Sequence, residues 1–199
     1  MTTRTQHATS ACSRILRLVI SLTVSGLALY PIPVLGGDIT AVSVDAASRV
    51  VKLYGAGGIR GLESYQTGIL VSSSGHILTV LSTAIDSEAI DCVLDDGRRY
   101  TASLVGADLH RELAVLKIEG INLPYFKISA DSPRQAIGTR VLALSNLFGV
   151  AVGDERVSIQ HGVVAAHVPL RARRGSHEAA YRGDVYILDC TTNNPGSPG

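Results

Sequence analysis

Short runs of alternating hydrophobic and polar residues, separated by Gly, Asp, Ser and Pro, make up the chain from about residue 45 onward. No long stretch has helical periodicity, and runs of this length and alternation are typical of β-strands. The predicted strands form a first group at 49–54, 67–72, 76–81, 89–94, 98–105 and 113–118, and a smaller group at 140–145, 157–166 and 184–190. The pattern therefore predicts an all-β fold, and the first group has the right size for one small barrel.

Turn signals divide these strands into two regions. Asp95-Asp96-Gly97 lies between two strands and predicts a hairpin, because glycine tolerates the positive φ that such turns need. A linker-like stretch covers 123–133, and the polar, basic segment 169–183 predicts a mobile surface loop. We therefore expect a first β-barrel over residues 45–122 and a second β region over residues 123–199.

The N-terminal region has the features of an export segment. Arg4, Arg14 and Arg17 occur without any acidic residue, and the apolar run 18–29 follows them. The length of this run fits the hydrophobic region of an export signal better than a membrane span. No clear small-x-small cleavage motif follows, so residues 1–36 are predicted to be either an export signal or an uncleaved anchor. The protein would then be periplasmic, secreted or anchored to a membrane.

The overall charge argues against a nucleic-acid partner. The net charge is +1 over 199 residues, which leaves little excess positive charge to attract nucleic acid. Trp is absent, so few aromatic side chains are present on which bases could stack. The local excess of Arg171, Arg173, Arg174 and Arg182 is interpreted as a solvated loop. We therefore predict no nucleic-acid binding, whereas a peptide or protein partner is compatible with the composition.

The cysteines do not predict a disulfide framework or a metal site. Cys12 lies in the export segment, which leaves only Cys92 and Cys190 in the predicted fold. We interpret them as two buried free thiols, and a single bridge or an intermolecular bond stays an open alternative. No metal, nucleotide or prosthetic-group motif occurs, so no cofactor is predicted.

Five motifs occur in order between about residues 50 and 199. The first is Thr-Gly-Ile-Leu-Val-Ser-Ser-Ser-Gly-His-Ile-Leu-Thr at 67–79. The others are Leu-Val-Gly-Ala-Asp (104–108) with Leu-Ala-Val-Leu-Lys-Ile (113–118), Leu-Ser-Asn-Leu-Phe-Gly (144–149), His-Gly-Val-Val-Ala-Ala (161–166) and Asn-Pro-Gly-Ser-Pro-Gly (194–199). Together they resemble the HtrA/DegP family of trypsin-like serine proteases.

The resemblance implies a chymotrypsin/trypsin-like fold with two six-stranded antiparallel β-barrels and an active site between them. In the family, further strands follow the nucleophile loop and close the second barrel. We therefore expect residues 123–199 to form an incomplete second barrel. A trimer is compatible with the resemblance, but the residues themselves do not specify an oligomeric state.

Two positions of the implied catalytic triad hold unusual residues. The position of the general-base histidine, counted from Thr79, holds Ser82, whose hydroxyl cannot accept a proton near neutral pH. His76 and His110 lie at a strand start and in a turn, so neither is expected to replace the base. The position of the orienting aspartate holds Glu112, which has no histidine to orient. It is expected to be a surface or interbarrel carboxylate that could pair with Arg111 or with another basic residue.

The motif at 194–199 resembles the nucleophile loop, and the alignment places Pro198 at the serine and Ser197 one position before it. Proline has no hydroxyl and no backbone N–H. The oxyanion hole of this fold uses the N–H of the nucleophile residue and that of the glycine two before it, here Gly196, so one of two donors is missing as well. A shift of one residue would instead place Ser197 at the nucleophile position, still without a base.

These substitutions predict a pseudoprotease, a trypsin-fold protein that binds a peptide or protein without cleaving it. The alternative is an active HtrA-like serine endopeptidase with unconventional or missing catalytic residues. A third alternative is a truncated gene product without a stable fold. The substrate or partner cannot be identified from these residues.

Overall fold

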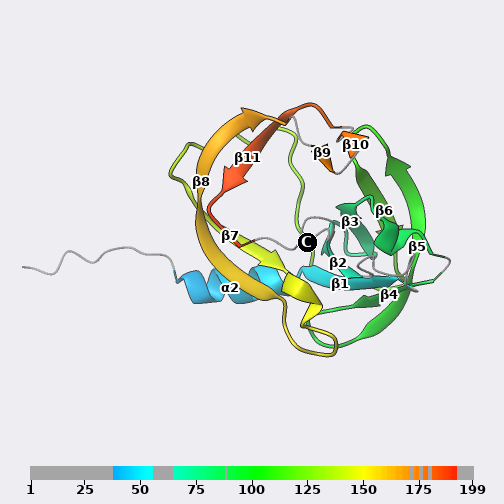
Figure 1. Ribbon diagram of the computed structural model, residues 1–199. Coiled ribbons are helices and arrows are strands. Elements are labelled where there is room, and N and C mark those ends of the chain that lie inside the picture. The colour runs from blue at the N-terminus through cyan, green and yellow to red at the C-terminus, as the bar shows by residue number, and fades with distance from the viewer. Residues whose placement is uncertain are drawn as a thin grey trace, which may run out of the picture. The chain divides into compact units, whose positions relative to one another are not determined.

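The computed structural model describes residues 38–55, 65–87, 89–170, 173–174, 177–178 and 181–191 (Figure 1). Residues 1–37 form a separate unit from residues 38–199. The predicted export segment therefore lies outside the described residues, and export stays a prediction. None of the described helices is long and apolar enough to cross a membrane.

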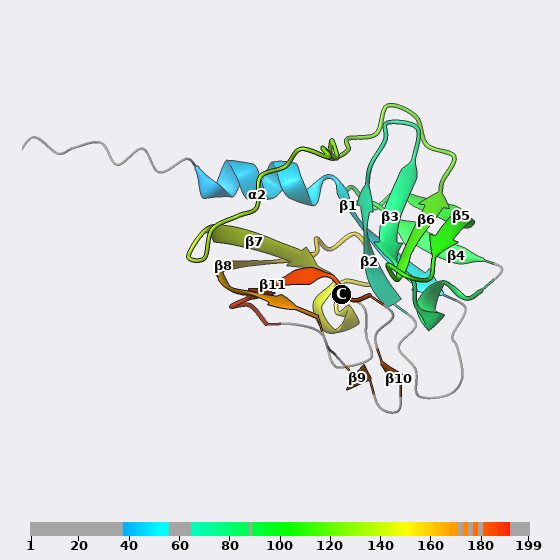
Figure 2. The same cartoon turned by 90° about the horizontal axis from the view of Figure 1, so that it is seen from above.

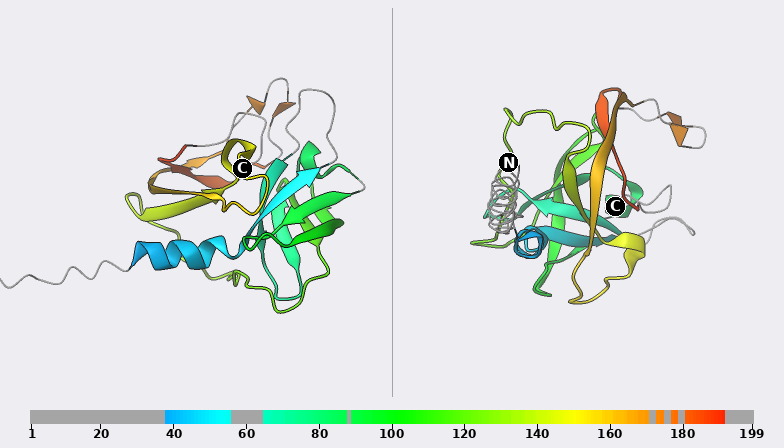
Figure 3. Two further views of the ribbon diagram at one scale, coloured as in Figure 1. Left: turned by 90° about the horizontal axis from the view of Figure 1, so that it is seen from below. Right: turned by 90° about the vertical axis from the view of Figure 1, so that its left-hand side faces the viewer.

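The described part of the chain begins with a helix that the sequence pattern did not predict. Helix α2 (Ile39–Ala47) leads directly into β1 (Val50–Gly55), as Figure 3 shows. Its N-cap is Asp38, whose carboxylate accepts a hydrogen bond from the backbone N–H of Thr40 at 3.0 Å. An ion pair of 2.6 Å between Asp45 and Arg49 spans its last turn. Local capping thus stabilises a helix whose β-branched residues give it no clear amphipathic signal.

The first predicted barrel is confirmed. Six antiparallel strands close in the order β1-β2-β3-β6-β5-β4, and Figure 1 shows them as a ring. After β1 they are β2 (Tyr65–Leu70), β3 (His76–Val80), β4 (Ile90–Val93), β5 (Arg99–Asp108) and β6 (Leu113–Lys117). Residues such as Leu53, Leu70 and Leu116 are fully buried inside the barrel. The alternation in the sequence is therefore the alternation between barrel core and outer face.

Two glycines make the tight turns of this barrel possible. The predicted hairpin between β4 and β5 is confirmed, and Gly97 in its turn has a φ of +82°. Gly75 precedes β3 with a φ of +93°, and a Cβ atom there would lie 2.4 Å from the carbonyl oxygen of Ile118. Any larger residue would displace the end of β6 at this point.

A second, open sheet follows the barrel, as Figure 2 shows. It consists of β7 (Arg140–Ser145), β8 (Ser158–Pro169) and β11 (Asp184–Leu188), in the antiparallel order β11-β8-β7. The predicted fold class is thus confirmed, with a closed six-stranded barrel and, in the described residues, a second, open three-stranded sheet. The predicted loop 169–183 is wrong in part, because β8 extends to Pro169 and the pair β9 (Arg173–Arg174) and β10 (His177–Glu178) lies within it.

Polar contacts join the barrel to the open sheet. The loop 146–157 between β7 and β8 lies against the outer face of β1, where Lys52 is only 1% exposed. The amine of Lys52 donates to the carbonyl oxygens of Gly153 at 2.6 Å and Glu155 at 2.5 Å. The hydroxyl of Tyr54 donates to the carbonyl oxygen of Ala151. We call this set of contacts the junction.

Both described cysteines are free, as predicted, although only Cys92 is fully buried and Cys190 is half-buried. Burial raises the pKa of the Cys92 thiol to about 12. Between about pH 9 and pH 12 the unfolded chain would lose this proton while the folded protein keeps it. The free energy of unfolding should therefore fall by up to about 1.4 kcal/mol per pH unit in this window.

We predict that Cys92→Ala removes this part of the pH dependence. Urea unfolding of both proteins between about pH 8 and pH 11 measures it, and Cys190 is present in each, so it does not contribute to the difference between them. Burial lowers the pKa of Lys52, so its contribution to the pH dependence of the free energy of unfolding has the opposite sign. Lys52 is present in both proteins, and this contribution is therefore common to them. Equal pH slopes in the two proteins would contradict the prediction.

Candidate functional site

Antiparallel pairing of β3 with β6 brings the predicted base and acid positions together. Val80 pairs with Leu113, and the backbone N–H of Leu81 donates to the carbonyl oxygen of Glu112 at 2.8 Å. Ser82 follows one residue later, so Ser82 and Glu112 flank the same end of the β3–β6 pair. The resemblance placed these two residues, thirty positions apart in the sequence, in one site, and the fold makes them neighbours.

The Ser82 hydroxyl uses its single proton and one lone pair in hydrogen bonds inside the protein. It donates to the amide oxygen of Gln66 at 2.5 Å and accepts from the backbone N–H of Ala84 at 3.1 Å. The second bond makes Ser82 the N-cap of the short helix η1 (Thr83–Ile85). Ser82 is therefore a structural residue in this fold, and its proton is held by a neutral amide, which is not a base.

Gln66 is the partner that the sequence analysis did not identify. It is fully buried, and its amide nitrogen donates to the hydroxyl of Thr79 at 2.8 Å and to the carbonyl oxygen of Val80 at 3.1 Å. Because its oxygen accepts from the hydroxyl of Ser82, both the nitrogen and the oxygen of the Gln66 side-chain amide are hydrogen-bonded. The predicted strand began only at residue 67, whereas β2 begins at Tyr65. Continuing its alternation backward from Leu70 and Gly68 would have placed Gln66 on the buried face.

Glu112 has an unusual backbone conformation, with a φ of +54° in the left-handed region. Its side chain is half-buried. The expected partner Arg111 instead forms an ion pair of 2.6 Å with Asp108, and Asp108 also accepts hydrogen bonds from the backbone N–H groups of His110 and Arg111. These bonds, that of the Arg111 guanidinium first, lower the pKa of Asp108.

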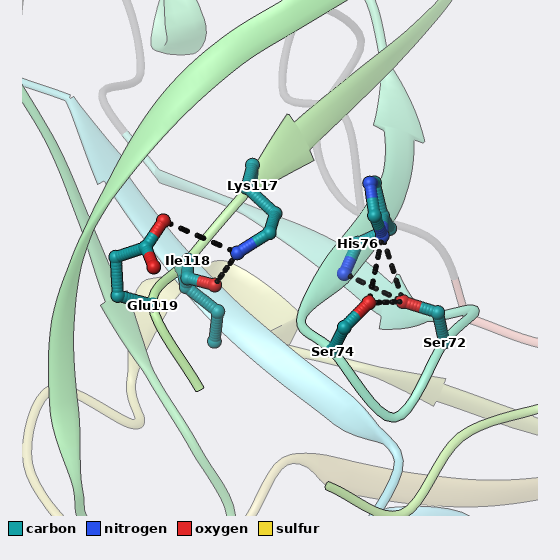
Figure 4. A network of polar contacts seen from close by, with 6 residues as sticks. All are labelled: Ser72, Ser74, His76, Lys117, Ile118 and Glu119. Carbon is teal, nitrogen blue, oxygen red and sulfur yellow. Dashed lines mark hydrogen bonds and ion pairs between the residues drawn. The ribbon is translucent and has the colours of Figure 1, made fainter. Parts of the chain in front are cut away.

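His76 does not supply a base to Ser82. It begins β3, whereas Ser82 lies beyond the other end of that strand. Its Nδ1 lies 2.8 Å from the hydroxyl of Ser72 and 3.3 Å from that of Ser74, and its backbone N–H donates to Ser72 (Figure 4). These contacts close the turn between β2 and β3. Figure 4 also shows Lys117, which pairs with His76 across the strands and binds Glu119 and the carbonyl of Ile118.

A hollow of about 340 Å³ lies beside Ser82. Its lining residues are Leu81, Ser82, Thr83, Ile85, Asp86 and Leu104. Within the described ranges, no group of three or more His, Cys, Asp or Glu residues could hold a metal ion. The hollow can therefore offer a ligand a concave surface, aliphatic side chains and the carboxylate of Asp86.

The predicted nucleophile loop lies outside the described residues. Gly196, Ser197 and Pro198 belong to 192–199, so their assignments stay predictions.

The chain matches the family model of the trypsin-like peptidase domain over residues 66–199. It is 32% identical to a protein of Chlamydia pneumoniae named as a probable periplasmic serine endoprotease, DegP-like, over 67% of this chain and 25% of that protein. For a protein with the same name from Pseudomonas putida, strain GB-1, the identity is 32% over 70% of this chain and 27% of that protein.

Solved structures agree with this similarity. The HtrA-type protease AlgW, solved with a tripeptide, is 33% identical with a TM-score of 0.54, over 65% of this chain and 40% of that one. A serine endoprotease from Yersinia pestis is 26% identical with a TM-score of 0.55, over 80% of this chain and 54% of that one. The chain thus spans about a quarter of the length of these curated relatives and about half of these solved chains.

We predict that Ser82 and Gln66 are energetically coupled. Ser82→Ala would leave a buried amide oxygen without a donor and should lower the free energy of unfolding by about 1–3 kcal/mol. With Gln66 already replaced by Met, the same change should cost only the N-cap, roughly 1 kcal/mol or less. A double-mutant cycle by urea denaturation measures the difference.

Ser132→Ala is a matched control, since this exposed serine lies in the linker and should change stability by no more than about 0.5 kcal/mol. Additive costs for Ser82→Ala and Gln66→Met would show that the two side chains do not interact.

Proposed function

Because the chain belongs to the trypsin-like peptidase family of HtrA/DegP type, we propose that it keeps the peptidase fold, binds a peptide or protein, and does not hydrolyse peptide bonds. The observation that carries this proposal is the hydrogen bonding of the Ser82 hydroxyl. The general-base position holds a hydroxyl that donates to Gln66 and caps η1. A residue in this state cannot take a proton from a nucleophile.

The sequence of the predicted nucleophile loop supports the same conclusion. Pro198 would remove both the attacking oxygen and one of two oxyanion donors. Loss of one such donor typically reduces the rate by about 100- to 1,000-fold, and loss of nucleophile or base by about a million-fold. These losses are not additive, but either of the larger ones abolishes useful turnover. In the alternative alignment Ser197 would be the nucleophile, and it would still have no base.

Binding is supported by surfaces that do not need the triad. In the described residues, the open sheet has β7 and β11 as its two edge strands, and sheet edges can bind extended peptides by main-chain hydrogen bonds. AlgW, which shares this fold, was solved with a tripeptide. A protein that holds an extended peptide without cutting it is consistent with both facts.

Export is the proposed location. Arg4, Arg14 and Arg17 followed by the apolar run 18–29 are typical of an export segment, and the DegP-like relatives are named as periplasmic proteins.

We predict that the exported protein hydrolyses unfolded casein no faster than a blank without protein, because the base position has no proton acceptor. A fluorogenic casein assay measures this, with a cooperative thermal transition in the same sample as the control for folding. Turnover that disappears on Ser197→Ala would contradict the proposal and would favour an active endopeptidase with Ser197 as nucleophile.

A further inference from the structure

The hollow beside Ser82 has the size of a small ligand site. Its volume of about 340 Å³ lies at the lower end of the range for small-molecule pockets, roughly 300–1,000 Å³. It is lined by one continuous segment at the end of β3 and by one residue of β5. The hollow is therefore built from the barrel alone and needs no residue of the open sheet.

Aliphatic side chains form three of its six lining positions. Ile85 is 3% exposed and belongs to the barrel core, which fixes that wall of the hollow. Leu104, in contrast, is 52% exposed. It lies at an irregularity in the pairing of β5 with β6, between Leu104 and Gly106, and bulges of this kind change the direction of neighbouring side chains. An exposed leucine beside a hollow gains free energy when an apolar group covers it.

Among the described residues, Asp86 is the only charged one that lines the hollow. Its side chain is exposed, and its carboxylate forms no hydrogen bond or ion pair within the described part of the chain, whereas its backbone N–H donates to the carbonyl oxygen of Thr83 at 3.3 Å. Ser82 adds no free donor, because its hydroxyl proton is bound by Gln66. The polar character of the hollow therefore comes mainly from one carboxylate and from the hydroxyl of Thr83.

An aliphatic stem that ends in a cation matches this combination. Lysine and arginine bury their methylene groups on apolar surface while the charged end stays near water and near an acid. We propose that the hollow binds the side chain of a lysine or arginine in the peptide partner. This inference rests on the proposed function, because it names the class of side chain that the bound peptide presents to the barrel.

The site binds and does no chemistry. Ser82 lines the hollow, but its hydroxyl is bonded to the side chain of Gln66 and to the backbone N–H of Ala84, so we assign it no chemical role there. Selectivity would come from the charge of Asp86, which favours a cation and repels an acidic side chain. The aliphatic wall would contribute equally to lysine and to norleucine, which has the same stem without the charge.

The test is a peptide titration monitored by nuclear magnetic resonance spectroscopy of the protein. Three blocked alanine pentapeptides are used, with lysine, norleucine or glutamate at the central position. The expected result is movement of the backbone amide signals of Thr83, Ile85, Asp86 and Leu104. We expect lysine to bind roughly two- to fivefold more tightly than norleucine, which is the range for exposed ion pairs. Glutamate should bind more weakly than both.

Two variants separate the charge from the apolar wall. Asp86→Asn should make the affinities for lysine and norleucine equal, whereas Asp131→Asn, an exposed acid in the linker, should leave their ratio unchanged. Leu104→Ser should weaken both peptides by a similar factor, roughly threefold or more. Leu104 is half-exposed, so this variant is expected to fold, and the dispersion of its spectrum verifies this.

The outcomes distinguish this proposal from the proposed function. Equal affinity for lysine and glutamate, or signal changes confined to the open sheet, would overturn the lysine site while peptide binding stands. No signal change with any of the three peptides would overturn it as well. New resonances from a cleaved peptide would contradict the absence of hydrolysis, and signal changes in the hollow would still support the site.

Discussion

The contact between the barrel and the open sheet depends on the burial of the Lys52 amine. Lys52 lies on a strand that is buried on both faces, and its charge is removed from solvent at the junction. Burial lowers its pKa, while the nearby acids Glu155 and Asp95 act in the opposite direction. Such a group is tolerated only when its donors are satisfied, here by the carbonyls of Gly153 and Glu155. Those carbonyls fix the loop from which β8 begins.

Hydrogen bonds continue from this junction to the base position. Asn146, fully buried, donates from its side chain to Tyr54 and from its backbone N–H to the hydroxyl of Thr67 at 2.9 Å. On the same strand, Gln66 faces the other way and binds Ser82. Thr79 connects the two, because its hydroxyl accepts from Gln66 and donates to the carbonyl of Thr67. The serine at the base position is thus one end of a network whose other end holds the second sheet.

The barrel could be predicted from the sequence because its strands are short apolar runs, alternating clearly in β2, β3 and β6, and because its turns carry glycine. The six strands differ from their predicted bounds by only a few residues, and β7 matches its prediction, 140–145. Helix α2 was missed because Val42 and Val44 are β-branched and only Ala47 is buried, so its cap is the sole strong signal. The positions of Ser82 and Glu112 came from the motif order, and the residue before Ser82, Leu81, donates its backbone N–H to the carbonyl oxygen of Glu112. The roles of Gln66 and Lys52 could not be predicted, since their partners lie 16 and about 100 residues away along the chain.

A hydroxyl that caps a helix cannot act as a base, and a serine without a base is not activated for attack. Labelling of the folded protein with a fluorophosphonate probe, measured by intact-mass spectrometry, tests for an activated serine most directly. We predict no adduct under conditions in which an active serine protease in the same tube is fully labelled. A single adduct on a serine of the folded protein, absent after heat unfolding, would contradict the proposal that this protein does not hydrolyse peptide bonds.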